Sequence, residues 1–144
     1  MIITFCGHSD YIERPGDEEK ILSILGEKVG DGFAELYFGD YGRFDHFARA
    51  CGEKYQKTHP NTKLIFISPY INRGFDKKEF DGIIYPELER VPLRFAIVHR
   101  NRWMAERADI VIACVTRSFG GAYETYTHAK RKKKEIFNIG NENI

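Results

Sequence analysis

The stretch VHRNRWMAERADIVIACVTRSFGGAYET, residues 98–125, decides the fold. It is typical of a helix that ends near Arg107, a buried strand over residues 109–115, and a glycine turn that opens a second helix. In a parallel sheet, this order brings cationic side chains and free backbone N–H groups to one edge. Such an edge suits an anionic ligand such as a phosphate.

The rest of the chain repeats this alternation of strands and helices. Strands are predicted over residues 2–6, 33–38, 63–67, 109–115 and 135–139. Helices are predicted over residues 17–29, from the 39–45 turn to residue 58, and over 94–107 and 121–132. The predicted fold class is therefore α/β: one Rossmann-like domain, residues 1–144, with a doubly wound parallel sheet of about five strands in the order 3-2-1-4-5. Residues 71–93 are irregular and polar, and they fit a lid or an oligomer contact equally well.

Composition and charge exclude several classes of protein. The 22 basic and 21 acidic residues leave a net charge of +1, which argues against nucleic acid and anionic membranes as partners. No apolar run approaches the roughly 20 residues of a membrane helix, and the N-terminus has no basic region or cleavage site of a signal peptide. Cys6, Cys51 and Cys114 are odd in number and far apart, which indicates free thiols and a cytoplasmic location. No spacing predicts a metal, and no cofactor is predicted.

Four loops are expected to meet at the carboxyl edge of the sheet: residues 7–9, 39–45, 68–70 and 116–124. The second and fourth are glycine-rich turns that run into helices, where the backbone can approach a phosphate closely. Neither matches the P-loop or the dinucleotide fingerprint. Each turn alone also fits a plain strand-to-helix connection. Two of them at one edge favour a ligand site.

The polar residues at this edge have both structural and functional interpretations. His8 fits a turn residue or a ligand contact, and Asp45 fits a helix-dipole partner or a hydrogen-bond acceptor for ribose. Arg100 is expected at a helix start, where a cation opposes the dipole, and this favours a functional role. One or two of the aromatic residues near the edge are expected to stack on a base. The aromatic candidates are Tyr41, Phe44, Tyr70, Tyr85, Phe119 and Tyr123.

Four motifs carry a resemblance to a known family. They are Phe5-Cys6-Gly7-His8, the turn 39–45, Arg100-Asn101-Arg102-Trp103-Met104 with Ala108-Asp109, and the turn 120–125. Together they resemble the SLOG superfamily, most closely its YpsA-like branch of small bacterial and phage proteins. The resemblance implies a Rossmann-like fold. The superfamily includes LOG-type phosphoribohydrolases, which cleave the N-glycosidic bond of nucleoside monophosphates, and DprA-type DNA-binding proteins.

The resemblance to LOG-type enzymes is incomplete at the catalytic turn. Arg100 matches their arginine position. In place of their Pro-Gly-Gly-x-Gly-Thr motif, this chain has Phe119 at the proline, Tyr123 at the last glycine and Glu124 at the threonine. Their catalytic glutamate position falls on Thr127, one helical turn after Glu124. The resemblance thus implies the phosphate-binding scaffold of these enzymes without a glutamate at their catalytic position.

Two functions of different class follow. The favoured one is a binding module that senses or sequesters a nucleotide-derived ligand, such as an ADP-ribose-like or cyclic nucleotide signal; similar phage-associated folds act as sponges for immune signals. The alternative is a nucleoside 5′-monophosphate phosphoribohydrolase with Arg100 and Glu124 as candidate catalytic residues. DNA binding is a third class, weakened by the charge. Small relatives form dimers or larger assemblies, so a homo-oligomer is expected.

Specific roles are predicted for the residues of the edge. The N–H groups of Gly120, Gly121 and Ala122 hold a phosphate, and Arg100 pairs with it. Ribose or a second phosphate is held by Gly39, Gly42 and Asp45. Polar contacts to sugar or base come from His8 and Glu124, and Gly7 is a further predicted ligand-binding residue.

Overall fold

The central strands are apolar on both faces, which is the pattern of a parallel sheet covered by helices on both sides. All five residues of β5 (Ile110–Cys114) are buried, as are residues 3–6 of β1 (Ile2–Gly7). These two strands pair in parallel, with Ile3 opposite Ile110 and Gly7 opposite Cys114. They form the centre of the sheet.

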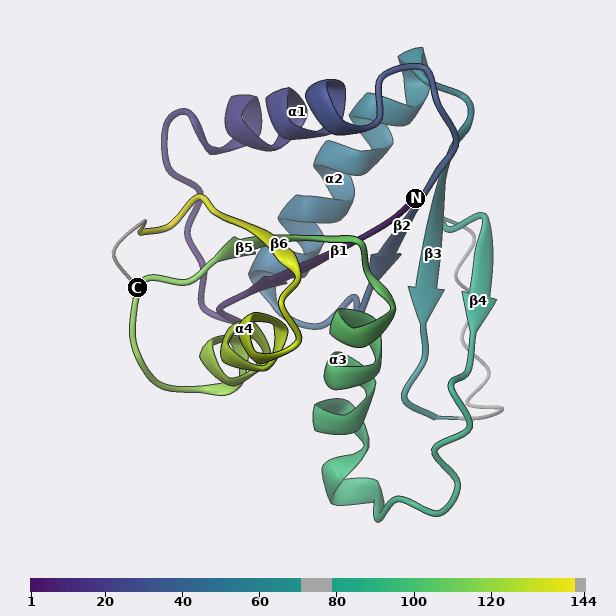
Figure 1. Cartoon of the computed structure of the whole chain (residues 1–144), viewed down its shortest axis with the longest axis vertical. Coiled ribbons are helices and arrows are strands. Elements are labelled where there is room, and N and C mark those ends of the chain that lie inside the picture. The colour runs from purple at the N-terminus through teal and green to yellow at the C-terminus, as the bar shows by residue number, and fades with distance from the viewer. Residues whose placement is uncertain (71–78, 142–144) are drawn as a thin grey trace.

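In the computed structural model, residues 1–70 and 79–141 are described. Over these residues the sheet has six parallel strands in the order β4-β3-β2-β1-β5-β6 (Figure 1). The remaining strands are β2 (Ala34–Phe38), β3 (Thr62–Ile67), β4 (Gly82–Ile84) and β6 (Glu135–Asn138). The helices are α1 (Asp17–Lys28), α2 (Arg43–Thr58), α3 (Ala96–Arg107) and α4 (Gly121–Arg131), and a 3₁₀ turn, η1 (Leu93–Phe95), precedes α3.

The helices form two layers, one on each face of the sheet. Ile21 and Leu25 of α1 and Phe44 and Ala48 of α2 pack in one cluster with alternate residues of the central strands, such as Phe5. On the other face, α3 and α4 pack against the residues of opposite parity. That cluster includes Ala105, Tyr126, Ala129, Cys6 and Val111. Figure 1 shows α1 and α2 on one side of the strands and α3 and α4 on the other.

The predicted fold class and strand order are confirmed, with one strand added. The additional strand, β4, pairs only with β3, where Ile65 lies opposite Gly82 and Ile67 opposite Ile84. It falls within residues 71–93, which were expected to be irregular. Three residues that include a glycine and an exposed isoleucine give no strand pattern. Residues 71–78 of that segment lie outside the described residues, and its role as lid or oligomer contact stays a prediction.

A buried carboxylate fixes the loop that follows β1. Asp17, 1% exposed, accepts hydrogen bonds from the Tyr11 hydroxyl at 2.6 Å and from Arg14 Nε and Nη2 at 3.1 and 3.2 Å. Arg14 also donates to the carbonyls of Ile139 and Gly140 beyond β6. Burial alone would raise the Asp17 pKa, but the bonds from Arg14 and Tyr11 outweigh it and hold the pKa below its usual value.

Replacing this carboxylate is expected to destabilise the fold. Asp17→Asn should lower the free energy of unfolding by about 2 kcal/mol, because it weakens charge-assisted hydrogen bonds to a buried acceptor. Since the folded pKa of Asp17 is depressed, this stabilisation is present at neutral pH. It is lost as the pH falls below the usual aspartate pKa of about 3.9 and through the folded value.

Urea unfolding at pH 7 and at pH 3 measures this effect, with Glu19→Gln in the same helical turn as the control. The difference between wild type and Asp17→Asn should shrink at pH 3. An equal difference at both pH values would contradict the assigned role of the charge.

Candidate functional site

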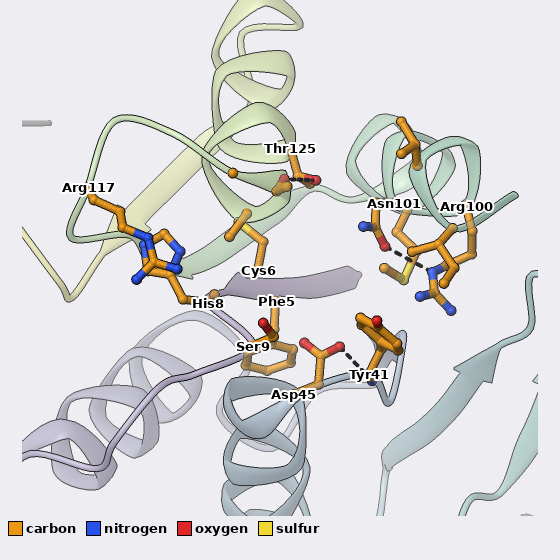
Figure 2. A pocket seen from close by; sticks show the side chains of 17 residues that line it. Phe5, Cys6, His8, Ser9, Tyr41, Asp45, Arg100, Asn101, Arg117 and Thr125 are labelled. Atoms are coloured by element: carbon orange, nitrogen blue, oxygen red, sulfur yellow. Dashed lines mark hydrogen bonds between the residues drawn. The ribbon is translucent and has the colours of Figure 1, made fainter. Parts of the chain in front are cut away.

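The two central strands mark the place where the strand order reverses. After β1 the chain builds β2, β3 and β4 on one side, and β5 and β6 on the other. Ligands of open α/β sheets bind at the carboxyl edge beside such a reversal. A cavity of about 280 Å³ lies there, between β1, the start of α2, α3 and the β5–α4 turn (Figure 2). Its lining residues are 5–9, Tyr41, Asp45, Ile97, Val98, Arg100, Asn101, Met104, Arg117, 120–122 and Thr125.

The cavity brings together most of the residues that the sequence predicts for the site. Those that line it are Gly7, His8, Asp45, Arg100, Gly120, Gly121 and Ala122. Gly39, Gly42 and Glu124 do not belong to its lining. Contact of any of them with a ligand stays a prediction.

Three of the predicted glycines are needed by the packing of the protein itself. A Cβ on Gly7 would overlap the ring of Phe44, and a Cβ on Gly39 would lie 2.9 Å from the Arg100 guanidinium. At Gly42, with φ 90°, a Cβ would lie 2.7 Å from Ser9 Cα. At Gly39 and Gly42, therefore, the groups that lie close to the backbone belong to the protein itself: Arg100 and Ser9.

The start of α4 differs from that of α2, although both helices begin after a glycine of the same conformation. Gly42 has φ 90° and ψ 173°, and Gly120 has φ 93° and ψ 173°. Ser9 fills the space beside Gly42. Among the described residues, by contrast, no atom beyond the chain neighbours and the backbone of α4 lies within 4 Å of a Cβ built on Gly120 or Gly121. Glycine has no side chain to cap a helix, so the first-turn N–H groups of α4 are left at the cavity wall. This is the geometry of an anion site.

Arg100 is used by the framework of the sheet. Its side chain is 1% exposed, and Nη1 donates to the carbonyls of Gly39 and Ile67 at 3.1 and 2.8 Å. Nε donates to Asn101 Oδ1 at 2.9 Å. These bonds join α3 to the carboxyl ends of β2 and β3. The expectation that Arg100 sits at a helix start is wrong, because α3 begins at Ala96 and Arg100 lies in its second turn.

His8 is held as a neutral hydrogen-bond acceptor. It is 6% exposed, and the Thr116 N–H donates to its Nε2 at 3.1 Å. Burial lowers its pKa, and the charge of Arg117 lowers it further. The ring therefore joins the loop after β1 to the loop after β5, which is the structural interpretation of His8. His8 also lines the cavity.

Asp45 reaches the cavity from the first turn of α2. The Tyr41 N–H donates to its Oδ2 at 2.9 Å, so the carboxyl group closes the turn before the helix. Burial raises the pKa of Asp45 to about 7, against the opposing effects of the Tyr41 N–H and the charge of Arg100. A carboxyl group with a pKa raised in this way inside a cavity is a candidate functional residue.

Glu124 lines a hollow that adjoins the cavity and is not part of the cavity lining itself. It is exposed, and it lines a shallow hollow of about 20 Å³ together with Arg102 and Asn101. The cavity wall on this helix is formed by Thr125 instead, whose hydroxyl donates to the Gly121 carbonyl at 3.0 Å. Glu124 therefore stands outside the cavity lining to which Asp45 and Arg100 belong, in a hollow whose wall shares Asn101, Gly121 and Thr125 with the cavity.

Sequence reasoning missed Arg117 and Asn101 as lining residues. Arg117 Nη1 and Nη2 form a fork with the Asp10 carboxylate at 3.2 and 3.1 Å, and Arg117 Nε is buried with no hydrogen-bond partner among the described residues. The sequence signal that could have identified Arg117 is its position, a cation three residues before Gly120.

Cys6 also lines the cavity, but burial raises its pKa to about 12, so the thiol stays protonated. Among residues 1–70 and 79–141, no three His, Cys, Asp or Glu side chains are placed to hold a metal ion.

Comparison with solved structures places this geometry in a known fold. A scan against protein families gives no match, and a search of curated proteins gives none either. The chain is similar in fold to DNA processing protein A from Helicobacter pylori. The TM-score is 0.62 at 16% sequence identity, over 96% of this chain and 64% of the other. That structure is described for its single-stranded DNA binding mode. In the described part of the present chain, no helix is long and apolar enough to cross a membrane.

The different roles of the glycines can be tested by stability. Gly7→Ala should lower the free energy of unfolding by about 2 kcal/mol, because the added methyl group must displace the buried Phe44 ring. Gly121→Ala is the control, since its methyl group enters open space at the start of a helix. Urea denaturation of both variants measures the difference. A Gly7→Ala protein as stable as Gly121→Ala would contradict the packing role of Gly7.

A second pair of variants tests Arg100. Arg100→Met should lower the free energy of unfolding by about 3 kcal/mol, because the carbonyls of Gly39 and Ile67 lose a buried donor. Arg102→Met, on the exposed side of the same helix, should stay within about 0.5 kcal/mol of wild type. Thermal and urea unfolding measure both. Equal stability of the two variants would show that Arg100 does not support the strand ends.

Proposed function

We propose that this chain binds a nucleotide-derived ligand in the cavity beside β1 and β5, with a phosphate group on the first turn of α4. The observation that carries the proposal is the open helix start at Gly120 and Gly121, which lines a cavity at the reversal of the strand order. Backbone N–H groups and the positive end of the helix dipole both favour an anion there.

Arg117 supports a phosphate at the same wall. Its Nε is a buried donor with no partner among the described residues, and such donors call for a partner such as a ligand or water. Its guanidinium is held by Asp10 on the side away from Nε. The cation that serves the ligand is therefore Arg117, while Arg100 keeps its bonds to the strand ends.

The size of the cavity limits the ligand. About 280 Å³ lies at the lower end of the roughly 300–1,000 Å³ of small-molecule sites. This volume suits one nucleotide unit. A larger ligand of the ADP-ribose type would place one nucleotide in the cavity and extend past Tyr41, which is 61% exposed at its rim.

Binding without turnover is favoured over hydrolysis. Glu124 is not part of the cavity lining and the Cys6 thiol is protonated, so Asp45 is the carboxyl group of the lining that is left as a base for hydrolysis. Sensing or sequestration of a nucleotide signal, as in the YpsA-like branch that the sequence resembles, fits this arrangement. Binding of a DNA strand, as described for the structurally similar protein, is the competing partner class that the experiment must include.

Calorimetric titration tests the proposal with AMP, ADP-ribose, cyclic AMP and a short oligothymidylate as ligands. Gly121→Asp should weaken binding of a phosphate ligand by about 100-fold, because it places a like charge at the phosphate position while it favours the helix dipole. Gly121→Asn is the control of equal size, and it should bind more tightly than Gly121→Asp. Chromatography of the same mixtures detects any free base.

Equal affinity of the Asp and Asn variants would contradict a phosphate at α4. Release of adenine from AMP would replace the binding module with the phosphoribohydrolase. Binding of the oligonucleotide alone would replace both with a DNA-binding function.

A further inference from the structure

The two walls of the cavity offer opposite kinds of hydrogen-bonding groups. Figure 2 shows Thr125 and the start of α4 on one side, and Asp45 and Tyr41 on the other, with Phe5 and Cys6 of β1 between them. The α4 wall supplies backbone N–H donors. The α2 wall supplies a carboxyl group, which is out of place in a site built only for an anion.

No ion pair within the described part of the chain explains why the Asp45 carboxyl group lies in the cavity wall. Among the described residues, no lysine, arginine or histidine forms an ion pair with its carboxyl group. Arg100 is directed to the carbonyls of Gly39 and Ile67 and to Asn101. Asp40, which lies nearer to the end of β2, is by contrast bound by Arg49 at 3.0 Å and lies 3.4 Å from His46.

One oxygen of Asp45 is fixed, and this fixes the direction of the other. Oδ2 accepts from the Tyr41 N–H at 2.9 Å, which closes the turn before α2 and leaves the carboxyl group turned toward the cavity (Figure 2). This half-buried carboxyl group keeps spare acceptor capacity, and since no described cation pairs with it, a bound ligand can supply neutral hydrogen-bond donors. Sugar hydroxyl groups are such donors.

We propose that Asp45 selects ligands with a ribose over those with a deoxyribose, by accepting hydrogen bonds from the sugar hydroxyls while the phosphate lies on α4. The inference rests on the proposed nucleotide-binding function and names its substrate class: ribonucleotides. A deoxy ligand would leave the carboxylate desolvated and without its donor, which disfavours that ligand. Tyr41, exposed at the rim of the same wall, lies where it can cover the sugar or the base.

The pH dependence gives this role a signature that a purely structural aspartate would lack. The groups that influence the Asp45 charge are the Tyr41 N–H, Arg100 on α3, Asp40 before α2 and Cys6 on β1. Hydroxyl donors favour the ionised carboxylate, so a ribose ligand lowers the Asp45 pKa and releases a proton on binding. The preference for ribose over deoxyribose should therefore grow from pH 6 to pH 8, around the free-protein pKa of about 7.

The experiment compares AMP with 2′-deoxy-AMP and 3′-deoxy-AMP by calorimetry at pH 6, 7 and 8. Because all three carry the same phosphate, its own titration cancels in the ratio of affinities. AMP should bind about 10- to 100-fold more tightly than at least one deoxy analogue at pH 8. Asp45→Asn keeps an acceptor for the Tyr41 N–H and should reduce the ratio to near one at every pH. Glu53→Gln removes one charge from the same helix outside the cavity, and it should leave the ratio unchanged.

Each outcome decides a specific claim. Equal affinity of AMP and both deoxy analogues for the wild type would overturn the ribose preference and leave nucleotide binding intact. A preference that persists in Asp45→Asn would assign ribose recognition to other residues. No binding of any of the three by the wild type would overturn the proposed nucleotide site together with this inference. The wild-type comparison needs no variant, so it holds even if Asp45→Asn fails to fold.

Discussion

The guanidinium of Arg100 determines how the carboxyl edge of the sheet is built. A buried cation is unfavourable unless its donors are bonded. Here Nη1 donates to carbonyls at the ends of two neighbouring strands, β2 and β3, and Nε donates to Asn101. This bond pattern fixes the position of α3 against the sheet and requires a glycine at position 39, where a Cβ would displace the guanidinium. The wall that α3 contributes to the cavity depends on this interaction.

Because Nη1 of Arg100 is bonded to the strand ends, we expect the proposed ligand to find its positive charge elsewhere. The open first turn of α4 and the Arg117 side chain are the available sources, and both lie on the far side of β1 from Asp45 (Figure 2). The two sides of the cavity therefore differ in charge, and no single sequence motif shows this difference. In the proposed site, one wall would hold an anion and the other a hydroxyl-bearing group.

The sequence predicts the sheet well because its strands are local apolar runs, as in residues 110–115, and each is separated from the next by a helix of clear periodicity. It does not predict β4, whose three residues gain their structure from pairing with β3. It also cannot assign Arg100 to the sheet, since the accepting carbonyls are 61 and 33 residues away in the chain. Gly42 and Gly120 look alike in sequence and in backbone conformation, and only tertiary packing by Ser9 closes one helix start and leaves the other open.

The shared fold with a protein described for binding single-stranded DNA does not by itself favour DNA for this chain. A phosphodiester strand of deoxyribose would satisfy the α4 wall, but along its length its sugars carry no free hydroxyl for Asp45. The carboxylate would then be buried beside phosphates with only the Tyr41 N–H as donor, an arrangement that raises its pKa further and weakens binding as the pH rises. A ribonucleotide satisfies both walls at once, and the net charge of +1 gives a long polyanion little additional attraction.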